Sequence, residues 1–195
     1  EKNRLYCMLA DKTSVYGKYV KDILDGVGRY PKNSVVFTGQ PRYDILAKAG
    51  KFFDKKKVIK NYGIDPDKKI ILITTQPLPS MEEREIFLRT VLKGLKFLCQ
   101  RHPDCQVVIK PHPNENGDWH DKIVGEEGID AVILPNWANT FEILYTCDVL
   151  ISYHSTTAFE AMILDKPVVI VNLFSKSDVM PFVSSGSAFG AYDGK

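Results

Sequence analysis

The sequence predicts an α/β domain built on a doubly wound parallel sheet, and three observations lead to this prediction. From residue 69 onward, short apolar runs that read as buried strands alternate with helical patterns. One stretch, residues 148–172, reads as strand, polar turn, helix and strand, which is a complete βαβ unit. A hydrophobic content of 44% and a charged content of 26% over 195 residues are typical of a soluble globular chain with a core of its own.

The first 63 residues predict shorter and less regular elements. Apolar residues at helical spacing indicate a helix over residues 15–24, and Gly63 is well placed to end a helix that Asp54 begins. The other elements expected in this part are a strand over residues 4–10, a strand over 34–38 and a brief helix over 44–49. The chain begins within a strand and stops soon after one, so we expect it to be a fragment of a longer protein.

Six strands are expected in the sheet, and the winding rules place them in the order 3-2-1-4-5-6. Along the chain they cover residues 70–75, 106–110, 131–134, 148–152, 168–171 and 187–191. Helices are expected over 82–100, 119–124 and 140–145 and after Thr157, and the first of them carries an apolar side formed by Ile86, Val91, Leu92, Leu95 and Leu98. The first strand neighbours the fourth, where the winding reverses, so the loops 74–76 and 154–157 open a crevice. A ligand is expected there, and Gln76 lies in the first of these loops.

The polar turn after the fourth strand reads as a phosphate-binding turn. Ser155, Thr156 and the N–H groups that follow lie where a strand ends and a helix begins, so free N–H groups and the helix dipole attract anions. Glu160, about one turn further on, is placed to accept from ribose hydroxyls. The alternative is structural, because Thr157-x-x-Glu160 fits the capping box T-x-x-E. The two interpretations are compatible, since a capped helix still presents free donors.

His112 is the second candidate, because it lies between two prolines after the second strand, beside the predicted crevice. A histidine there can donate to a phosphate and takes up a proton more readily beside an anion. A purely structural histidine is the alternative. Lys110 could assist His112, although its place in the strand can also direct it towards a covering helix. Trp137 and Phe141 follow the third strand and read as core or rim packing residues, with nucleobase stacking as the alternative.

Other functional classes lack their motifs. The sequence contains no G-x-G-x-x-G, no G-x-x-x-x-G-K-[ST] and no G-x-S-x-G. A net charge of +2, with basic and acidic residues interspersed, argues against a nucleic-acid binder, and the lysine run 55–57 reads as a solvated helix face. The four cysteines form no C-x-x-C pair, and Cys99-x-x-His102-x-x-Cys105 lacks the further ligands of a zinc site. No segment has the length of a membrane span and no signal peptide opens the chain, so a cytoplasmic location is expected.

Three motifs follow one another in a recognisable order: residues 38–44 (TGQPRYD), Lys110-Pro111-His112-Pro113, and residues 154–157 (HSTT) followed by Glu160-Ala161 and Lys166-Pro167-Val168. With these motifs, residues 36–190 resemble the C-terminal, nucleotide-binding half of GT-B-type glycosyltransferases. The most similar groups are the capsule polysaccharide and CDP-glycerol glycerophosphotransferases, together with the non-hydrolysing UDP-N-acetylglucosamine 2-epimerases.

The resemblance implies roles for several residues. His112, Ser155 and Thr156, with Thr157 and Gln76 beside them, would bind the phosphates of a nucleotide-sugar or nucleotide-polyol donor. Glu160 would contact the ribose, and the base would lie near Pro135, Asn136 and Phe141. The epimerases typically carry an acidic residue followed by Ser-Gly-Gly at the turn, whereas residues 153–156 read Tyr-His-Ser-Thr here. The serine-rich turn of the polymer transferases is more similar, and an epimerase remains the alternative.

The resemblance also implies the setting of the reaction. Residues 1–63 would be an interdomain segment with a remnant of an N-terminal half, and residues 64–195 a Rossmann-like nucleotide-binding domain. A glycan or lipid-linked acceptor and the catalytic base would belong to the N-terminal domain, so no catalytic residue is assigned. No metal or cofactor is expected. The full protein is expected at the inner face of the membrane, as a transferase of surface polysaccharide or glycolipid biosynthesis. The remaining alternative is a nucleotide-binding module that is inactive alone.

Overall fold

The computed structural model describes residues 10–192 except 28–29, 116–117 and 176–179. Most of the strand predicted over residues 4–10 therefore lies outside the described residues. The chain divides into two compact units, Glu1–Ile45 and Leu46–Lys195, and each is described separately. Among the described residues, no helix combines the length and the apolar character that crossing a membrane requires.

The first unit contains a small βαβ arrangement. Strand β1 (Thr13–Val15) pairs in parallel with β2 (Val35–Phe37), and α1 (Lys18–Val27) connects them. The predicted helix start at residue 15 is wrong, because Val15 belongs to β1, where it pairs with Phe37 and is buried. Pairing across two short strands thus overrides the helical spacing of the first apolar residue.

A segment of short helices follows in the place of the one brief helix predicted over residues 44–49. It consists of a 3₁₀ turn η1 (Pro41–Tyr43), α2 (Asp44–Ala47) and α3 (Ala49–Phe52). Helix α4 (Lys55–Tyr62) begins and ends as predicted. The Asp54 side chain accepts from the N–H groups of Lys56 and Lys57, and Gly63 ends the helix in the left-handed conformation at φ 64°.

The second unit is built on a six-stranded sheet in which every pairing is parallel. Its strand order, β5-β4-β3-β6-β7-β8, is the predicted order 3-2-1-4-5-6. The strands are β3 (Lys69–Thr74), β4 (Cys105–Lys110), β5 (Ala131–Ile133), β6 (Val149–Ser152), β7 (Val168–Val171) and β8 (Phe189–Ala191). The prediction of a doubly wound α/β fold is confirmed.

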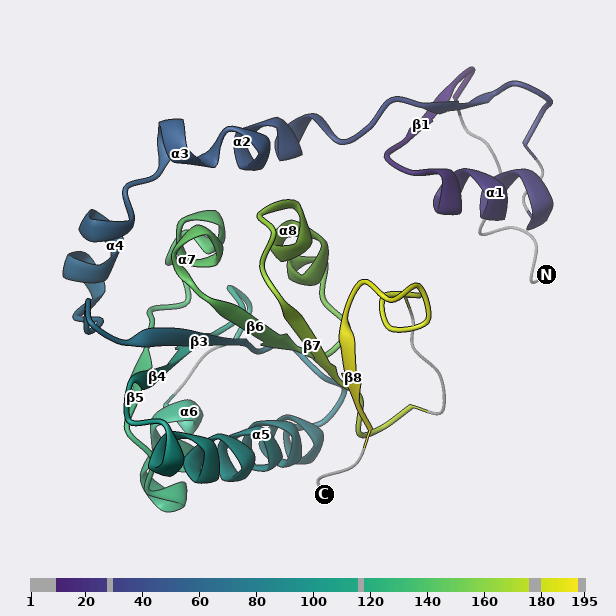
Figure 1. The fold of residues 1–195 in the computed structure, drawn as a ribbon. Helices are drawn as coiled ribbons and strands as arrows, with labels where there is room; N and C mark the ends of the chain where they lie inside the picture. Colours follow the sequence, from purple (N-terminus) through teal and green to yellow (C-terminus); the bar gives the residue numbers. More distant parts are fainter. Residues whose placement is uncertain (1–9, 28–29, 116–117, 176–179, 193–195) are drawn as a thin grey trace. The chain divides into compact units, whose positions relative to one another are not determined.

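Helices cover both faces of this sheet (Figure 1). On one face lie α5 (Met81–Arg101) and α6 (Trp119–Glu127), and on the other lie α7 (Thr140–Thr146) and α8 (Thr157–Ile163). Successive side chains of β3 alternate between the two cores: Ile70 and Leu72 pack with α4, α7 and α8, whereas Ile71 and Ile73 pack with α5. Burial on both sides explains why the strands read as continuous apolar runs.

Helix α5 buries a different set of apolar residues from the one predicted. The Ser80 hydroxyl and the Glu83 carboxylate form a capping box at its start. Ile86 and Leu98 were expected in the core, but they are 42% and 38% exposed. The buried stripe consists of Phe87, Leu88, Val91, Leu92 and Leu95. Because these five recur at helical spacing on one side, Ile86 points away from the sheet and Leu98 lies beyond the end of the stripe.

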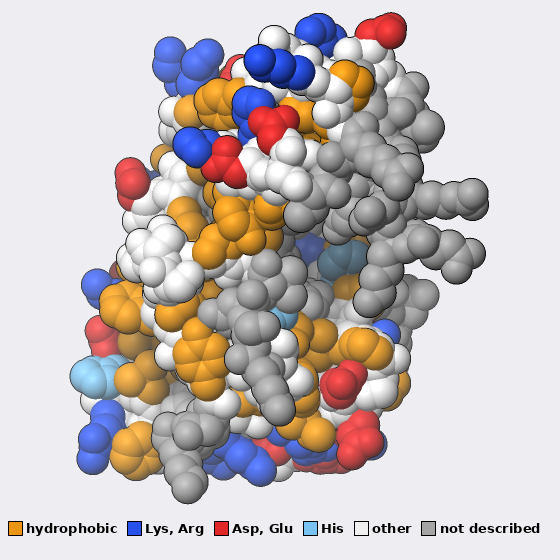
Figure 2. Space-filling view, turned by 90° about the vertical axis from the view of Figure 1, so that its right-hand side faces the viewer, with side chains coloured by type: hydrophobic (Ala, Val, Ile, Leu, Met, Phe, Trp, Pro, Cys, Tyr) orange, Lys and Arg blue, Asp and Glu red, His pale blue; other side chains and the backbone are white. Residues whose placement is uncertain are grey.

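Strand β8 forms an edge of the sheet, and its side chains are largely open to solvent. Phe189 is 72% exposed, and Tyr192, just after the strand, is 51% exposed. Among the side chains that Figure 2 shows in colour, apolar and charged ones lie interspersed. The sequence predicted this strand over residues 187–191, and the observed strand is shorter.

Candidate functional site

The candidate site lies at the carboxyl edge of the sheet. Because all six strands are parallel, the loops that follow β3, β4 and β6 emerge along the same edge. Strand β3 is the direct neighbour of both β4 and β6. His112 follows β4 and Ser155 follows β6, so the two candidates lie on loops at one edge of the sheet, with strand β3 between their strands. The predicted crevice loops are therefore neighbours in the structure.

Hydroxyl groups connect the end of β3 to the turn before α8. The Thr74 hydroxyl donates to Ser152 Oγ over 2.9 Å and lies 3.2 Å from Thr157 Oγ1. Since the single proton of Thr74 goes to Ser152, Thr157 acts as the donor in the second bond. The Thr157 N–H donates to Ser155 Oγ over 3.2 Å. Ser155 is half-buried and Thr156 is exposed, so the hydroxyl of Thr156 is accessible to a ligand.

The capping-box interpretation of this turn is wrong. The N-cap is Thr156 instead of Thr157, its backbone is in the α-helical region, and its side chain makes no capping bond. The hydroxyl of Thr157 is committed to Thr74, which explains why it does not cap the helix. Glu160 is only 2% exposed, so it lies within the domain beside the turn. Its contact with a ribose stays a prediction.

Hydrogen bonds within its loop hold His112 and select one tautomer of its neutral ring. The His112 N–H donates to Glu115 Oε2 and the His112 carbonyl accepts from the Glu115 N–H, both over 2.9 Å. The Asn114 N–H donates to His112 Nδ1 over 3.1 Å. Since Nδ1 accepts, the neutral ring carries its proton on Nε2. His112 is half-buried and presents an Nε2–H donor of the kind that a phosphate oxygen accepts.

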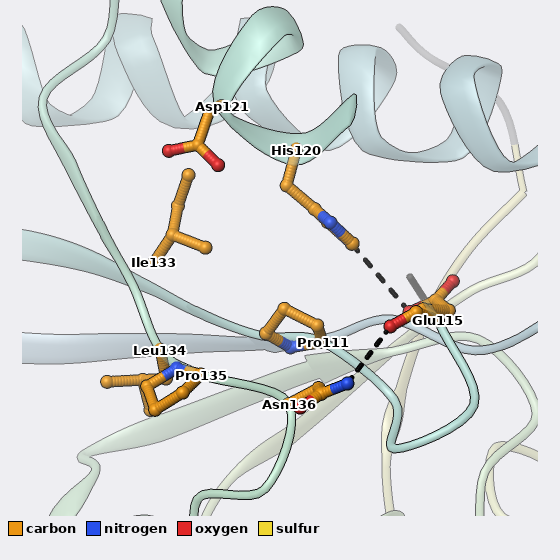
Figure 3. Close-up of a pocket in the computed structure, with 8 residues that line it drawn as sticks. All are labelled: Pro111, Glu115, His120, Asp121, Ile133, Leu134, Pro135 and Asn136. Atoms are coloured by element: carbon orange, nitrogen blue, oxygen red, sulfur yellow. Dashed lines mark hydrogen bonds and ion pairs between the residues drawn. The ribbon is translucent and has the colours of Figure 1, made fainter. Parts of the chain in front are cut away.

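A buried polar cluster that was not predicted lies behind this loop and is formed by Thr75, Glu115 and His120. Figure 3 shows two of its members, Glu115 and His120, whose Oε2 and Nε2 atoms lie 3.7 Å apart. The Thr75 hydroxyl donates to Glu115 Oε2, and Thr75 Oγ1 lies 3.2 Å from His120 Nε2. Burial alone would raise the pKa of Glu115, but the nearby His120 ring and the hydrogen bonds from Thr75 and the His112 backbone outweigh burial and leave that pKa below its ordinary value. The carboxylate is therefore charged at neutral pH. The only indication of this cluster in the sequence is that Glu115 follows His112 by three residues, the spacing at which the two residues are hydrogen-bonded.

The Lys110 side chain reaches the loop after β5 instead of a covering helix. Its Nζ donates to the carbonyls of Pro111 and Asn136 over 2.6 and 2.8 Å, and the side chain is buried. Burial lowers the pKa of Lys110, and the nearby charge of Glu115 partly opposes this effect. Lys110 therefore fastens the loop that follows β5, where the base-binding residues were predicted.

A cavity of about 290 Å³ lies between α6 and the ends of β4 and β5 (Figure 3). Its walls include Pro135 and Asn136, two of the predicted base-binding residues, together with Glu115 and His120. The Asn136 amide donates to the carbonyls of Glu115 and Pro113 over 3.2 and 3.4 Å. The third predicted residue, Phe141, is not among those that line this cavity. It is half-buried in the first turn of α7.

Two further residues with predicted roles, Gln76 and Trp137, lie in the loops that follow β3 and β5. Gln76 is half-buried in the loop after β3, and its carbonyl accepts from the Leu78 N–H over 2.8 Å. Trp137 is 77% exposed, so it does not pack in the core, and rim packing and nucleobase stacking stay predictions. Among the described residues, no three metal-ligating side chains gather into a possible metal site. The roles of these residues towards a ligand stay predictions.

Comparison with known proteins relates this geometry to a family. The family described as CDP-Glycerol:Poly(glycerophosphate) glycerophosphotransferase matches residues 4–174, which is most of the chain. The chain belongs to this family. Its match includes the loops that carry His112 and Ser155 and the whole of strands β3 to β7.

A curated relative and several solved structures resemble this member of the family. A processive diacylglycerol beta-glucosyltransferase of Bacillus licheniformis is 35% identical over 102 residues, which is 51% of the chain and 23% of that protein. The S. aureus MnaA–UDP structure superposes with a TM-score of 0.67 at 19% identity, over 94% of the chain and 49% of its own. A UDP-N-acetylglucosamine 2-epimerase gives a TM-score of 0.66 at 18% identity, over 94% and 46%.

The wall teichoic acid polymerase TagF, soaked with CDPG, also has a similar fold. It gives a TM-score of 0.57 at 17% identity, over 83% of the chain and 38% of its own. At these identities the structural likeness concerns the fold alone. The chain spans less than half of the length of each of these proteins, so the activity of a whole protein is treated below as a proposal.

Proposed function

We propose that the chain is the donor-binding half of a GT-B transferase that acts on a surface polysaccharide, capsule, teichoic acid-like polymer or glycolipid. Its donor would be a nucleotide-polyol or nucleotide-sugar. The family match carries this proposal, since the family transfers glycerophosphate from CDP-glycerol to a polymer, as its description states. The shared edge of the sheet supports it, because His112 and the Ser155–Thr156 turn lie on loops only one strand apart.

The geometry supports stabilisation of a leaving phosphate. In either type of transfer an acceptor hydroxyl displaces a nucleotide, and negative charge develops on the oxygen that leaves. His112 Nε2–H and the Thr156 hydroxyl would donate to phosphate oxygens in this state. Donors held in place by the fold need no reorganisation during the reaction, which is the main source of such stabilisation. We propose that no metal or cofactor takes part.

A second candidate, epimerisation of a UDP-sugar, is favoured by the likeness in fold to UDP-N-acetylglucosamine 2-epimerase. The turn sequence Tyr153-His154-Ser155-Thr156 supports the transferase instead, because the epimerases typically have an acidic residue followed by Ser-Gly-Gly there. A nucleotide-binding module that is inactive alone is a third reading of this chain. Incubation of the full-length protein with UDP-N-acetylglucosamine, followed by analysis for the manno product, tests the epimerase directly.

Binding measurements with the 195-residue chain test the proposal. We expect calorimetric titration to detect CDP or UDP, with a preference for one base, and to find weaker binding of the corresponding monophosphate. Replacing His112 with Ala removes one donor to the phosphates and should weaken binding of the diphosphate roughly tenfold. The exposed His102 provides a matched control, and His102→Ala should leave the affinity unchanged. A chain that binds none of these nucleotides would contradict the proposal.

We further propose that the full protein meets a lipid-linked or glycan acceptor at the cytoplasmic face of a membrane. An exposed basic segment supports this location. Residues 46–63 carry six lysines and one acidic residue, while the whole chain has a net charge of only +2. Phe52, in the middle of this segment, is 60% exposed. Lysines around an exposed aromatic ring suit an anionic lipid surface.

Co-sedimentation with vesicles tests this location. We expect the chain to bind vesicles that contain an anionic phospholipid and to leave neutral ones unbound. At about 1 kcal/mol per lysine, the triple variant Lys56→Gln, Lys57→Gln, Lys60→Gln should lose roughly a hundredfold in partitioning. The control is a triple variant on the opposite face of the sheet, Lys93→Gln, Lys96→Gln, Lys122→Gln. Equal losses in both variants would show that net charge alone drives binding and would contradict the assignment.

A further inference from the structure

Glu115 connects the loop that carries His112 to the loop after β5, where the base is expected. Its side chain accepts from the His112 N–H and the Thr75 hydroxyl, and its backbone carbonyl accepts from the Asn136 amide. One residue thus contacts the end of β3, the His112 loop and the loop after β5. Glu115 is 3% exposed, so these contacts are shielded from water.

The hydrogen bonds in this cluster run in one direction. The Thr75 proton goes to Glu115, so Thr75 Oγ1 accepts from His120 Nε2–H, which lies 3.2 Å away. His120 is itself buried, and its ring stacks against Trp119 with centroids 3.7 Å apart. The Thr75 hydroxyl, which itself accepts from His120, therefore donates to Glu115 Oε2. The same carboxylate oxygen accepts from the His112 N–H.

These bonds leave one polar group of His112 uncommitted among the contacts within its loop. Its N–H and carbonyl are both paired with Glu115, and Nδ1 is occupied by the Asn114 N–H, which belongs to the same turn. The remaining group is Nε2–H. Fixing the turn therefore fixes both the ring tautomer and the direction in which the ring can donate.

Lys110 extends the connection to the loop after β5. Its ammonium donates to the Asn136 carbonyl over 2.8 Å, while the Asn136 amide donates to Glu115 and Pro113. Asn136 is thus held from both its backbone and its side chain. Opposite charges on Lys110 and Glu115 lie within one buried cluster at this point.

We propose that Glu115 is a positioning residue of the donor site, which orients His112 Nε2–H towards the phosphates and holds the Asn136 loop in register with it. The inference rests on the proposed function for the identity of the ligand, but not for the effect of Glu115 on the His112 ring. A side chain that only supported the fold would affect stability without acting specifically through His112.

A double-mutant cycle separates these roles. We expect Glu115→Gln to weaken binding of CDP or UDP roughly tenfold, because loss of the negative charge weakens the hydrogen bonds that Oε2 accepts from the His112 N–H and the Thr75 hydroxyl. Binding of the nucleoside alone should change less than about twofold. His112→Ala should give a loss like that of Glu115→Gln, and the double variant should be no weaker than His112→Ala. Additive losses, or equal losses with nucleoside and nucleoside diphosphate, would overturn the proposal.

Heteronuclear NMR of the histidine rings provides a test without any ligand. The wild-type chain should show His112 as a single Nε2–H tautomer, and Glu115→Gln should show a mixture of tautomers. Glu126→Gln, at an exposed ion pair with Arg89, is the matched control and should leave the His112 signals unchanged. An unaltered His112 tautomer in folded Glu115→Gln would overturn the proposal even if the chain binds no nucleotide.

A second variant covers the case in which Glu115→Gln does not fold. Thr75→Val keeps the carboxylate and its charge and removes one donor to it. We expect a smaller disturbance of the same kind, with a detectable second His112 tautomer and a loss of diphosphate affinity of several-fold. Thr75→Val with wild-type tautomer and wild-type affinity would count against the cluster as the element that positions His112.

Discussion

Lys110 offers the sharpest test of the energetics in the buried part of the site. Its side chain is 2% exposed, and its ammonium donates to the carbonyls of Pro111 and Asn136. Lys110→Met keeps the length and the apolar stem of the side chain but removes the charge and both donors. Each lost charged hydrogen bond costs about 1.5–3 kcal/mol, and removal of the buried ammonium returns part of this. We expect a net loss of about 2–3 kcal/mol in the free energy of unfolding at pH 7.

The pH dependence adds a signature that a simple packing defect lacks. Burial lowers the pKa of Lys110 in the folded chain, whereas the unfolded chain keeps the ordinary value of 10.5. Between these two values the unfolded state binds more protons than the folded state, so the wild-type stability rises with pH. The Met variant has no such group. The stability difference between wild type and Lys110→Met should therefore grow as the pH rises towards 10.5.

Urea unfolding followed by tryptophan fluorescence at several pH values from neutral to alkaline measures both effects. Lys93→Met, on the exposed side of α5, is the control and should change stability by less than about 0.5 kcal/mol at every pH. A Lys110→Met variant as stable as wild type would refute the claim that the two carbonyls depend on this ammonium. A stability difference that stays constant with pH would refute the lowered pKa.

Three further predictions concern the framework and are checked by simpler measurements. Leu88→Ala, at a fully buried position of α5, should lose about 2–5 kcal/mol of unfolding free energy in urea, while Ile86→Ala, at a position 42% exposed, should lose far less. Gly63→Ala should lower the thermal midpoint by the equivalent of about 1–2 kcal/mol, because φ is +64° there; Gly94→Ala, inside α5 with open space at its Cβ position, should be neutral or stabilising. Burial raises the pKa of Cys147 to about 12, so mass spectrometry after iodoacetamide treatment at pH 8 should find Cys147 modified only in unfolded protein.

The sheet could be predicted well because its information is local. Strands β3, β4, β6 and β7 are each a short apolar run in the sequence. Because crossovers between parallel strands are right-handed, few strand orders are possible. Asp54 and Gly63 predicted both ends of α4 because a cap depends on a few adjacent residues. Val15 was predicted wrongly because its partner, Phe37, lies far along the chain and cannot be read from its neighbours.

The candidate site could be predicted only in part. His112 and Ser155 stand out because prolines or hydroxyl groups interrupt an apolar pattern at the end of a strand. Glu115 and His120 do not stand out, since their burial depends on how α6 folds back over β4. Thr157 and Glu160 fitted the capping-box pattern, but the bond between Thr157 and Thr74 joins residues 83 positions apart and overrides it. Long-range contacts of this kind leave no trace in a local pattern.

The bond between Thr74 and Ser152 has a consequence for how the protein is made. These residues lie 78 positions apart, and the bond exists only once β6 has inserted beside β3. The unit from β3 to β5 can form early from local contacts, but closing the centre of the sheet must wait for the later strand. During synthesis the loops after β3 and β6 would therefore meet late, only after residue 157 has left the ribosome, and recognition of a nucleotide would report that β6 has joined the sheet.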